Sequence, residues 1–357
     1  MRDLFDVRSA RMQHVPTLVR PVSPGRDIRA WWTLFRAFHR WKPAIVHTHM
    51  AKAGAVGRLA AIAYNLTTRR QRALIVHTYH GHVFEGYFGR LTTAVILRIE
   101  RWLARRSDVL VAISLNVRED LVRTYAIAAD AQVVVVPLGF DLRRFTAITD
   151  DERKSARRTL GIPEGARVVT TVGRLTQIKA QSHFLHAAKQ LKGQDGYVFL
   201  VVGNGELRQN LEDEAKQLAV DRSVRFLGWR GDLETVYGAT DVFVLTSKNE
   251  GTPVALIEAM AAGVACVSSD VGGVRDVITS EAVGIVVPFG DIDALARSIA
   301  SLAGDPAART RMGSHARQEV RQRFDQARLV DEITTLYRRI LNDGGTISPP
   351  VGSRPAS

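Results

Sequence analysis

Asp-Val-Phe-Val-Leu-Thr-Ser-Lys-Asn-Glu-Gly-Thr-Pro-Val-Ala-Leu-Ile-Glu-Ala-Met-Ala-Ala-Gly, residues 241–263, is the stretch that decides the fold. Its first part is short, apolar, β-branched and aromatic, which is typical of a strand buried on both faces. Thr252 is a favourable N-cap, and Pro253 suits the first helical position because a missing N–H needs no acceptor there. Gly263 suits the left-handed residue that follows a helix. The stretch therefore predicts a strand over 241–246 and a helix from about Pro253 to Ala262.

The junction between this strand and this helix suits a ligand that carries phosphate. Free backbone N–H groups near Gly251, Thr252 and Val254 lie at a helix N-terminus, which attracts anions. Glu250 precedes this terminus, and Glu258 lies inside the helix. Since carboxylates repel phosphate, we expect both to accept hydrogen bonds from hydroxyl groups attached to it. A sugar nucleotide carries both kinds of group.

The motif Glu-Gly-Thr-Pro-Val-Ala-Leu-Ile-Glu-Ala-Met-Ala-Ala-Gly (250–263) resembles the signature of retaining glycosyltransferases of family 4. The resemblance implies an α/β fold of the glycosyltransferase-B type, in which two Rossmann-like domains face each other across a cleft. In that family the second domain provides most of the nucleotide-sugar site. By resemblance Glu250 contacts hydroxyls of the donor sugar and Glu258 accepts from the ribose. Gly251, Thr252 and Pro253 are then donor-binding residues.

Two further segments resemble the same family. In Leu-Ile-Val-His-Thr-Tyr-His-Gly-His (74–82), His80 before Gly81 matches the strand-end histidine that reaches the donor sugar from the first domain. In Gly-Arg-Leu-Thr-Gln-Ile-Lys (173–179), Arg174 and Lys179 follow a predicted strand. Cations at this place can clamp the donor pyrophosphate and stabilise the leaving nucleoside diphosphate. Ala180 stands where the family usually has glycine.

The length of 357 residues and the hydrophobic content of 46% are sufficient for two domains. We predict an N-terminal acceptor-side domain over 1–150, a nucleotide-sugar-binding domain over 151–325, a helix over 326–343 that crosses back to the first domain, and a disordered tail over 344–357. Compared with the family, the first strand, glycine-rich loop and helix are missing before Thr17. We therefore expect a front truncated by roughly 30 residues or more.

The N-terminal segment up to His14 is polar and basic and has no clear period. We predict a strand over Thr17–Val22 and a helix over 29–40 with Asp27 as its N-cap. We interpret the apolar residues that recur along this helix as core: Trp31, Trp32, Leu34, Phe35 and Phe38. The segment Phe84–Arg90 is rich in glycine and aromatic residues, which is typical of a mobile loop.

The predicted helix over 91–106 is amphipathic and basic, and it has two interpretations. Its apolar residues are Val95, Ile96, Ile99, Trp102 and Leu103, and its arginines lie largely elsewhere. The helix either rests on anionic lipid or packs on the sheet with a solvated charged side. We favour the second interpretation, because five apolar residues also suit a Rossmann-like helix.

Two pairs of residues resemble metal ligands, and we favour a structural role for each. His47 and His49 would share one face of a strand, but no third ligand is evident at a suitable spacing. Asp291-Ile-Asp293 resembles the metal-binding motif of the other main glycosyltransferase fold, yet Phe289 and Gly290 before it favour a helix start. We therefore expect no metal site and no cofactor apart from the donor substrate.

Charge and cysteine content limit the function further. The net charge is +13, which suits either an anionic partner, such as a donor phosphate, a lipid surface or nucleic acid, or an ordinary solvated basic surface. We find no nucleic-acid-binding motif. The single cysteine, Cys266, lies in an apolar run and suits the core, so a reducing compartment is expected. No apolar stretch reaches the roughly 18 residues of a membrane span, and no signal-peptide core is evident.

These observations predict a retaining, metal-independent glycosyltransferase that uses a nucleoside diphosphate sugar and a glycan or lipid-linked acceptor. The setting would be polysaccharide or glycoconjugate synthesis in the cytoplasm, with peripheral contact to the inner face of the membrane as an option. No nucleic acid is expected as a partner. Two alternatives stay open at this point: a non-hydrolysing sugar-nucleotide epimerase, which shares the architecture, and a non-catalytic basic binding protein.

Overall fold

The computed structural model describes residues 12–19, 21–68, 72–81, 90–193 and 196–344. The chain divides into two compact units, which are described separately. The first comprises residues 1–113, 117–135 and 335–357, and the second comprises 114–116 and 136–334. The expected tail, apart from Gly344, and the expected loop Phe84–Arg90, apart from Arg90, lie outside the described residues.

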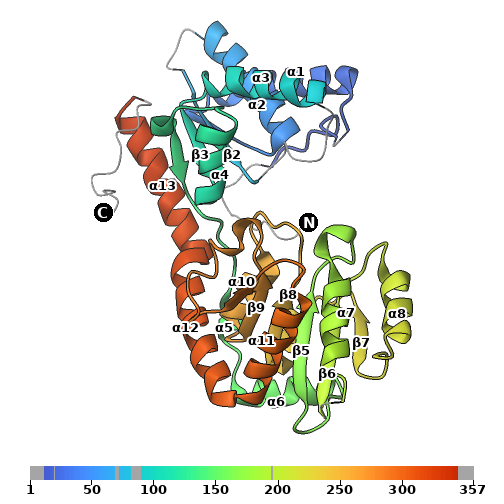
Figure 1. Ribbon diagram of the computed structural model, residues 1–357. Coiled ribbons are helices and arrows are strands. Elements are labelled where there is room, and N and C mark those ends of the chain that lie inside the picture. The colour runs from blue at the N-terminus through green and yellow to red at the C-terminus, as the bar shows by residue number, and fades with distance from the viewer. Residues whose placement is uncertain (1–11, 20, 69–71, 82–89, 194–195, 345–357) are drawn as a thin grey trace. The chain divides into compact units, whose positions relative to one another are not determined.

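The first unit is built on a parallel sheet of four strands in sequential order. These are β1 (Ile45–His49), β2 (Leu74–Tyr79), β3 (Val109–Ala112) and β4 (Val133–Val135). Helices α2 (Ala51–Thr67) and α3 (Arg90–Ala104) connect successive neighbouring strands. Right-handed crossovers place both helices on the same face of the sheet. Helix α1 (Pro24–Trp41) packs against α2 (Figure 1).

Helix α1 begins earlier than the sequence indicates. Its N-cap is Ser23, with Pro24 in the first turn, so the expected N-cap Asp27 is wrong. The Asp27 carboxylate instead accepts a hydrogen bond from the Ser23 N–H at 3.0 Å and pairs with the Lys52 ammonium at 2.6 Å. This arrangement lowers the pKa of Asp27, first through the hydrogen bond from Lys52.

Two other expectations for the N-terminal segment are wrong. The described residues of Thr17–Val22 form no strand, and the Leu18 N–H instead closes a turn on the Val15 carbonyl at 3.1 Å. Trp32, expected in the core, is 50% exposed. Helical spacing identified the helix but could not decide which part of its aromatic surface is covered.

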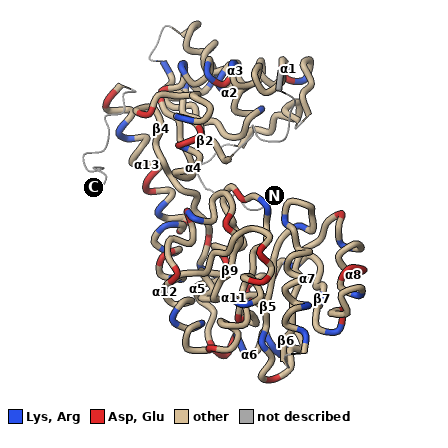
Figure 2. The backbone as a smooth tube through the Cα atoms, in the orientation of Figure 1, with Lys and Arg blue, Asp and Glu red and all other residues tan. Residues whose placement is uncertain are grey.

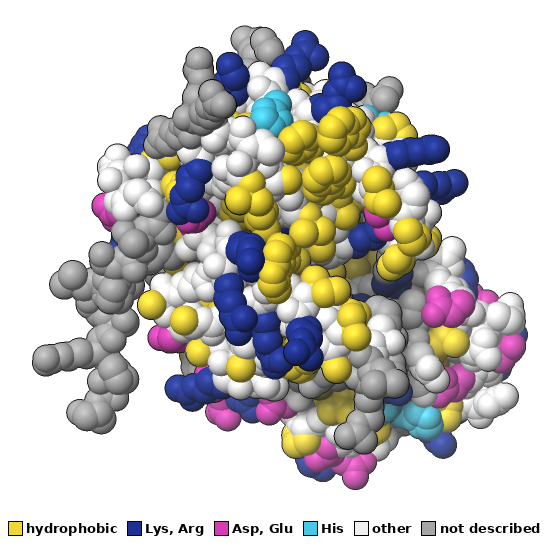
Figure 3. Space-filling view, turned by 90° about the horizontal axis from the view of Figure 1, so that it is seen from above, with side chains coloured by type: hydrophobic (Ala, Val, Ile, Leu, Met, Phe, Trp, Pro, Cys, Tyr) yellow, Lys and Arg dark blue, Asp and Glu magenta, His cyan; other side chains and the backbone are white. Residues whose placement is uncertain are grey.

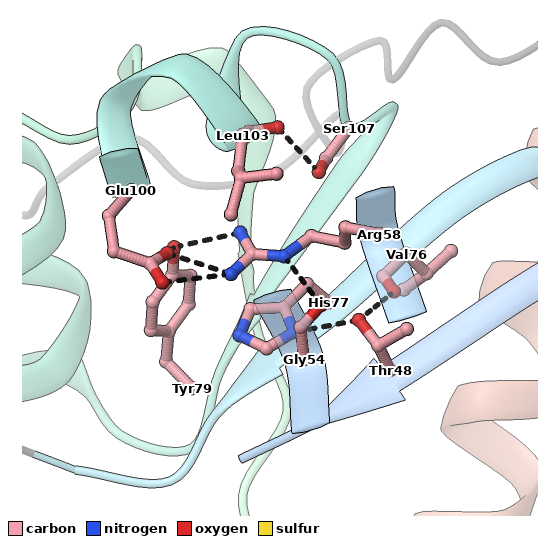
Figure 4. Close-up of polar contacts among 9 residues, drawn as sticks. All are labelled: Thr48, Gly54, Arg58, Val76, His77, Tyr79, Glu100, Leu103 and Ser107. Atoms are coloured by element: carbon pink, nitrogen blue, oxygen red, sulfur yellow. Dashed lines mark hydrogen bonds and ion pairs between the residues drawn. The ribbon is translucent and has the colours of Figure 1, made fainter. Parts of the chain in front are cut away.

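A buried polar network joins α2, α3 and β2 (Figure 4). Arg58 on α2 is fully buried, and its guanidinium donates to both carboxylate oxygens of Glu100 on α3, at 2.8 and 3.0 Å. The Tyr79 hydroxyl donates to the same carboxylate at 2.8 Å. Because a buried charge without its partner is costly, this network fixes the rotation of α3 with Glu100 facing inward.

The second unit has a six-stranded parallel sheet in the order β10-β9-β8-β5-β6-β7. The strands are β5 (Arg167–Val172), β6 (Tyr197–Val202), β7 (Val224–Gly228), β8 (Val242–Leu245), β9 (Ala265–Ser269) and β10 (Ile285–Val287). Alternate residues of β8 enter different apolar clusters: Val242 and Val244 one cluster, Phe243 and Leu245 the other. Since successive strand residues point to opposite faces, both faces of the sheet are covered. Cys266 lies in the second cluster and is fully buried, as expected of a core residue.

Helices complete both units. They are α4 (Leu115–Glu119), α5 (Arg143–Thr146), α6 (Asp150–Thr159), α7 (Gln181–Gln190), α8 (Arg208–Gln217), α9 (Leu233–Ala239), α10 (Val254–Ala261), α11 (Ile292–Gly304), α12 (Pro306–Phe324) and α13 (Gln326–Asn342). The interpretation of Asp291 as a helix start is confirmed, because its side chain caps α11 by accepting from the Ala294 N–H at 2.8 Å.

Helix α13 belongs to both units. Its residues up to Thr334 belong to the second unit and those from Thr335 onward to the first. In the first unit the Tyr337 hydroxyl lies 2.5 Å from Nδ1 of His47 at the sheet.

Candidate functional site

The central contact of the candidate site is an ion pair between two predicted residues of the second unit. Nζ of Lys179 lies 2.6 Å from Oε1 of Glu250. The Ser247 hydroxyl donates to the same oxygen at 2.5 Å. The Glu250 carboxylate is largely buried, and its Oε2 atom forms no hydrogen bond with any residue that the structure describes. One oxygen is therefore held in place while the other is available to a ligand hydroxyl.

Backbone contacts hold the two loops of this pair together. Lys179 follows β5 and Glu250 follows β8, and these strands are neighbours in the sheet. The Lys248 N–H donates to the Ile178 carbonyl at 2.8 Å, and the Thr246 hydroxyl donates to the Lys179 carbonyl at 3.0 Å. Both loops thus lie at the carboxyl edge of the parallel strands, which is where open α/β sheets bind ligands.

Helix α10 begins beside this pair, one residue later than expected. Pro253 is the N-cap and Val254 the first helical residue, so the prediction that Thr252 caps the helix is wrong. Proline cannot donate, and its side chain provides no cap, so the first-turn N–H groups stay available to an anion.

The C-terminal end of α10 is as predicted. Gly263 has φ of +72°, its N–H donates to the Met260 carbonyl, and the Val264 N–H donates to the Ala259 carbonyl. These are the two bonds of a Schellman motif. The helix is therefore well defined at both ends, which fixes the direction of its N-terminus.

A glycine pair supports the loop that carries Glu250. The Gly273 N–H donates to the Glu250 carbonyl at 2.8 Å. A Cβ atom on Gly272 would lie 2.1 Å from the Glu250 carbonyl oxygen, and one on Gly273 would lie 2.0 Å from that of Gly251. Because no side chain fits in either place, the backbone segments approach closely only with glycine at both positions.

Glu258, on the first turns of α10, has its own set of partners. The Tyr237 hydroxyl donates to Oε2 of Glu258 at 3.1 Å, and the Arg144 guanidinium lies 4.0 Å from Oε1. Burial raises the pKa of the Glu258 carboxyl, while Tyr237 and then Arg144 act to lower it. Tyr237 and Arg144 were not predicted from the sequence, since both lie far from the motif and only the fold brings them to it.

Arg174 lies in a loop whose backbone is in close contact with the turn at Gly203 and Gly205. Its guanidinium is exposed and forms no ion pair within the described part of the chain. A Cβ atom on Gly203 would lie 1.9 Å from the Gly173 carbonyl oxygen, and one on Gly205 would lie 2.3 Å from that of Leu175. The Gly-Asn-Gly turn at residues 203–205 therefore packs directly against this loop.

His80 belongs to the first unit, whereas the other predicted site residues belong to the second. It follows β2 directly, and its Nε2 atom lies 3.0 Å from Nδ1 of His49. Since one nitrogen must donate and the other accept, the pair fixes the orientation of both rings. Burial lowers the pKa of both histidines, so both favour the neutral form.

Ser247, like Tyr237 and Arg144, is a residue of the candidate site that the sequence analysis missed. It is fully buried between the end of β8 and Glu250. The only signal was a hydroxyl residue three positions before a loop glutamate, a spacing that many turns share. Over the residues that the structure describes, no group of three or more His, Cys, Asp or Glu side chains is arranged to hold a metal ion.

Known families match both parts of the chain. The model described as "Glycosyl transferases group 1" matches residues 152–319, and that described as "Glycosyltransferase Family 4" matches residues 3–144. The chain therefore belongs to the family 4 glycosyltransferases and is a glycosyltransferase, as the signature over 250–263 predicted.

Curated relatives support this assignment over most of the chain. The UDP-Gal:alpha-D-GlcNAc-diphosphoundecaprenol alpha-1,3-galactosyltransferase of Escherichia coli is 30% identical over 92% of this chain and 84% of that protein. The D-inositol 3-phosphate glycosyltransferase of Saccharomonospora viridis is 31% identical over 83% of this chain and 70% of that protein.

Solved structures share the fold. Anabaena HepE in complex with UDP has a TM-score of 0.78 and is 21% identical, over 87% of this chain and 82% of that one. Sucrose-phosphate synthase from Thermosynechococcus elongatus has a TM-score of 0.72 and is 23% identical, over 90% and 81%. The predicted glycosyltransferase-B fold class is therefore confirmed. None of the described helices combines the length and apolar character needed to cross a membrane.

Proposed function

We propose that the enzyme transfers a glycosyl group from a UDP-sugar to a lipid-linked glycan acceptor, with retention of anomeric configuration. The observation that carries the proposal is the Lys179–Glu250 pair at 2.6 Å, beside the N-terminus of α10. The Escherichia coli relative is named for a UDP-galactose donor and a diphosphoundecaprenol-linked acceptor, which supports both substrate classes.

The donor diphosphate is assigned to the cations and the helix terminus of the second unit. Lys179 and Arg174 supply positive charge, and the N–H groups around Gly251, Thr252 and Val254 add hydrogen bonds; Pro253 leaves this turn open. Glu258 accepts from a ribose hydroxyl, with its carboxylate oriented by Tyr237.

Glu250 and His80 are assigned to the sugar. The free Oε2 atom of Glu250 accepts from a sugar hydroxyl, and neutral His80 donates or accepts at another. As the bond to the diphosphate breaks, Lys179, Arg174 and the α10 terminus stabilise the negative charge on the leaving group. The acceptor hydroxyl then attacks the oxocarbenium-like centre from the same face and passes its proton to the departing diphosphate. We propose that these groups make a metal ion unnecessary, so that turnover should persist in excess EDTA.

A lipid-linked acceptor places the reaction at a membrane surface. We therefore propose a cytoplasmic enzyme that works in peripheral contact with the inner face of an anionic membrane. The net charge of +13 favours this location over a neutral surface.

A thermal-shift panel tests the donor site directly. The nucleotides UDP, GDP and ADP and their common sugar conjugates are compared on the wild type, on Lys179→Ala and on Lys192→Ala, an exposed lysine of the same unit. We expect a rise in Tm with UDP ligands that Lys179→Ala abolishes and Lys192→Ala preserves. No shift with any nucleotide, or a shift insensitive to Lys179, would refute the donor assignment.

Product analysis separates transfer from the two alternatives. A transferase releases free UDP only when acceptor is present, whereas an epimerase converts the sugar nucleotide without acceptor. A basic nucleic-acid binder would instead bind duplex with a steep salt dependence and give no nucleotide shift.

A further inference from the structure

Helix α3 buries its only carboxylate and exposes three large apolar side chains. Glu100 is buried against Arg58, whereas Val95, Ile99 and Trp102 are 58%, 47% and 39% exposed. Their spacing of four and three residues places them on one side of the helix. The interpretation of α3 as a helix with its apolar side packed on the sheet is therefore wrong for these three residues.

The two neighbouring helices of the same layer also expose large apolar side chains. On α1, Ile28 and Trp32 are 67% and 50% exposed, and on α2, Leu59 and Leu66 are 39% and 82% exposed. We define the α1–α3 face as these four residues together with Val95, Ile99 and Trp102. Seen from above, hydrophobic side chains gather over this layer, with Lys and Arg side chains around them (Figure 3).

The charged side chains of this layer that have no ion-pair partner among the described residues are all positive. The only acidic residues in α1, α2 and α3 are Asp27 and Glu100, and each is paired, at 2.6 Å with Lys52 and at 2.8 Å with Arg58. The charged positions are marked along the backbone in Figure 2. Exposed arginines of this layer that form no ion pair with any described residue are Arg26, Arg29, Arg36, Arg40, Arg98, Arg105 and Arg106.

Tryptophan and arginine also contact each other here. The Arg106 guanidinium lies 3.9 Å from the centre of the Trp102 ring. Trp and Arg are both amphipathic: each places an apolar body against hydrocarbon and a polar end in the headgroup region. Their combination with exposed Leu, Ile and Val is typical of surfaces that insert shallowly into lipid.

We propose that the α1–α3 face docks on an anionic lipid bilayer. Charge decides against a second copy of the chain, because arginines would then face arginines with no carboxylate between them. Nucleic acid would satisfy the arginines but would leave the aliphatic side chains Leu66, Val95 and Ile99 without a partner. A bilayer with anionic headgroups satisfies both the apolar and the cationic groups.

The network of Figure 4 gives this docking a consequence for the reaction. Glu100 anchors α3 to Tyr79, the last residue of β2, and His80 follows directly. A bilayer bound to α3 is therefore connected, through the buried Glu100–Tyr79 hydrogen bond, to the end of β2, and His80, the proposed sugar-contacting residue, follows that strand. The docking is argued from the surface of α1, α2 and α3, whereas this consequence also rests on the proposed function, in which His80 contacts the sugar.

Vesicle sedimentation of the full chain, without any nucleotide, tests the docking. We compare phosphatidylcholine vesicles with vesicles in which about a third of the lipid is phosphatidylglycerol. We expect binding only to the anionic vesicles, weakened at least tenfold when the salt is raised from about 0.1 M to 0.5 M. Bromine-labelled lipid should quench the fluorescence of Trp32 and Trp102. Changing both residues to Phe should therefore remove most of the quenching.

Two variants separate the apolar and the cationic contributions. Val95→Ser, Ile99→Ser and Trp102→Ser together remove apolar contacts, and Arg36→Glu with Arg98→Glu reverses charge; all five positions are exposed, so the fold should persist. We expect each set to weaken vesicle binding at least tenfold. The control, Trp229→Ser with Arg297→Glu, changes an exposed Trp and an exposed Arg of the second unit and should bind as the wild type.

Several outcomes would overturn the proposal. These are equal binding to neutral vesicles, no binding to anionic vesicles, wild-type binding by either variant set, or a dimer in light scattering that the same substitutions dissociate. The nucleotide thermal shift is measured on the same samples. A variant that keeps this shift but no longer binds vesicles separates docking from donor binding. A wild type that shifts with UDP but does not bind vesicles refutes the docking and the proposed membrane contact, and leaves the donor assignment intact.

Discussion

Lys179 Nζ lies 2.6 Å from Glu250 Oε1. The residue proposed to bind the donor diphosphate and the residue proposed to bind the sugar are therefore paired with each other in the free enzyme. The pair neutralises both charges in a partly buried setting, with Ser247 as a third member. If Lys179 contacts the donor diphosphate, its bond to Glu250 must weaken at the same moment. Donor binding would then also release the carboxylate for a sugar hydroxyl.

Glu250→Gln tests this coupling. The amide no longer competes for the Lys179 ammonium, so we expect UDP to bind at least as tightly as to the wild type. Turnover should fall on the order of 100-fold, because a neutral amide stabilises a developing positive charge poorly. Calorimetry with UDP and initial rates with acceptor measure the two effects. Unchanged turnover would contradict the role of Glu250, and lost UDP binding would contradict the coupling.

Ser247→Ala tests the orientation of the same carboxylate. The buried hydroxyl donates to Oε1 of Glu250 at 2.5 Å, and a hydrogen bond to a charged group contributes about 1.5–3 kcal/mol. Without it Glu250 is held by Lys179 alone, so we expect kcat to fall about tenfold with little change in KM for the donor. Ser301→Ala, on the exposed surface of α11, is the control. A matching rise in KM would instead indicate a role in ground-state binding.

The site and its scaffold differ in how well the sequence predicts them. The strand and helix around 241–263 carry strong local signals, which are a β-branched run, a proline at a helix start and a glycine at its end, and the structure contains both elements. Thr252 is the predicted N-cap, whereas the structure has Pro253 in that position. The prediction is wrong because both residues suit a helix start. Local chemistry at one position cannot decide it.

Local sequence patterns do not predict contacts between residues that lie far apart in the chain. The rotation of α3 depends on Arg58 receiving Glu100 from 42 positions further along the chain, and no local pattern contains that pair. Without it, the apolar residues of α3 are naturally assigned to the core. Tyr237 on α9 reaches Glu258 on α10 in the same way, from 21 positions earlier in the chain.

Gly273→Ala tests the close approach behind the Glu250 loop. The added Cβ atom would lie 2.0 Å from the Gly251 carbonyl oxygen, so the two backbone segments must separate. We expect a lower Tm and UDP binding weakened about tenfold or more, since the α10 terminus shifts with the loop. Gly304→Ala, where the added atom meets no other atom within 4 Å, should lower neither the Tm nor the UDP affinity. An unaltered UDP affinity in Gly273→Ala would exclude the loop from the donor site.

Ala180→Gly is expected to stabilise the protein. Ala180 has φ of +47°, a left-handed conformation that is costly for a residue with a Cβ atom, and the family usually has glycine here. We expect a gain of about 0.5–1 kcal/mol in the free energy of unfolding of the second unit. Ala307→Gly, at a helical residue of α12, should change stability in the opposite direction. Urea unfolding measures both, and a loss in Ala180→Gly would show that the strain is relieved in solution.

His47 should make stability depend on pH in a defined window. Burial, with His49 and His80 nearby, lowers the pKa of His47 to about 4, while the unfolded chain has a value of about 6.5. Between these values the unfolded state binds a proton that the folded state does not. The free energy of unfolding should therefore fall as the pH drops from about 6.5 to 4, with no contribution from His47 above that window.

Two variants isolate this effect. His47→Asn cannot titrate, so its stability should fall less steeply over the window. Tyr337→Phe removes the partner at 2.5 Å but keeps the imidazole, so it should lose about 1 kcal/mol at neutral pH and retain the slope. Urea unfolding at a series of pH values measures both. Equal slopes in the wild type and His47→Asn would mean that another group controls the acid sensitivity of the first unit, and His77, whose pKa burial also lowers, would be the next residue to replace.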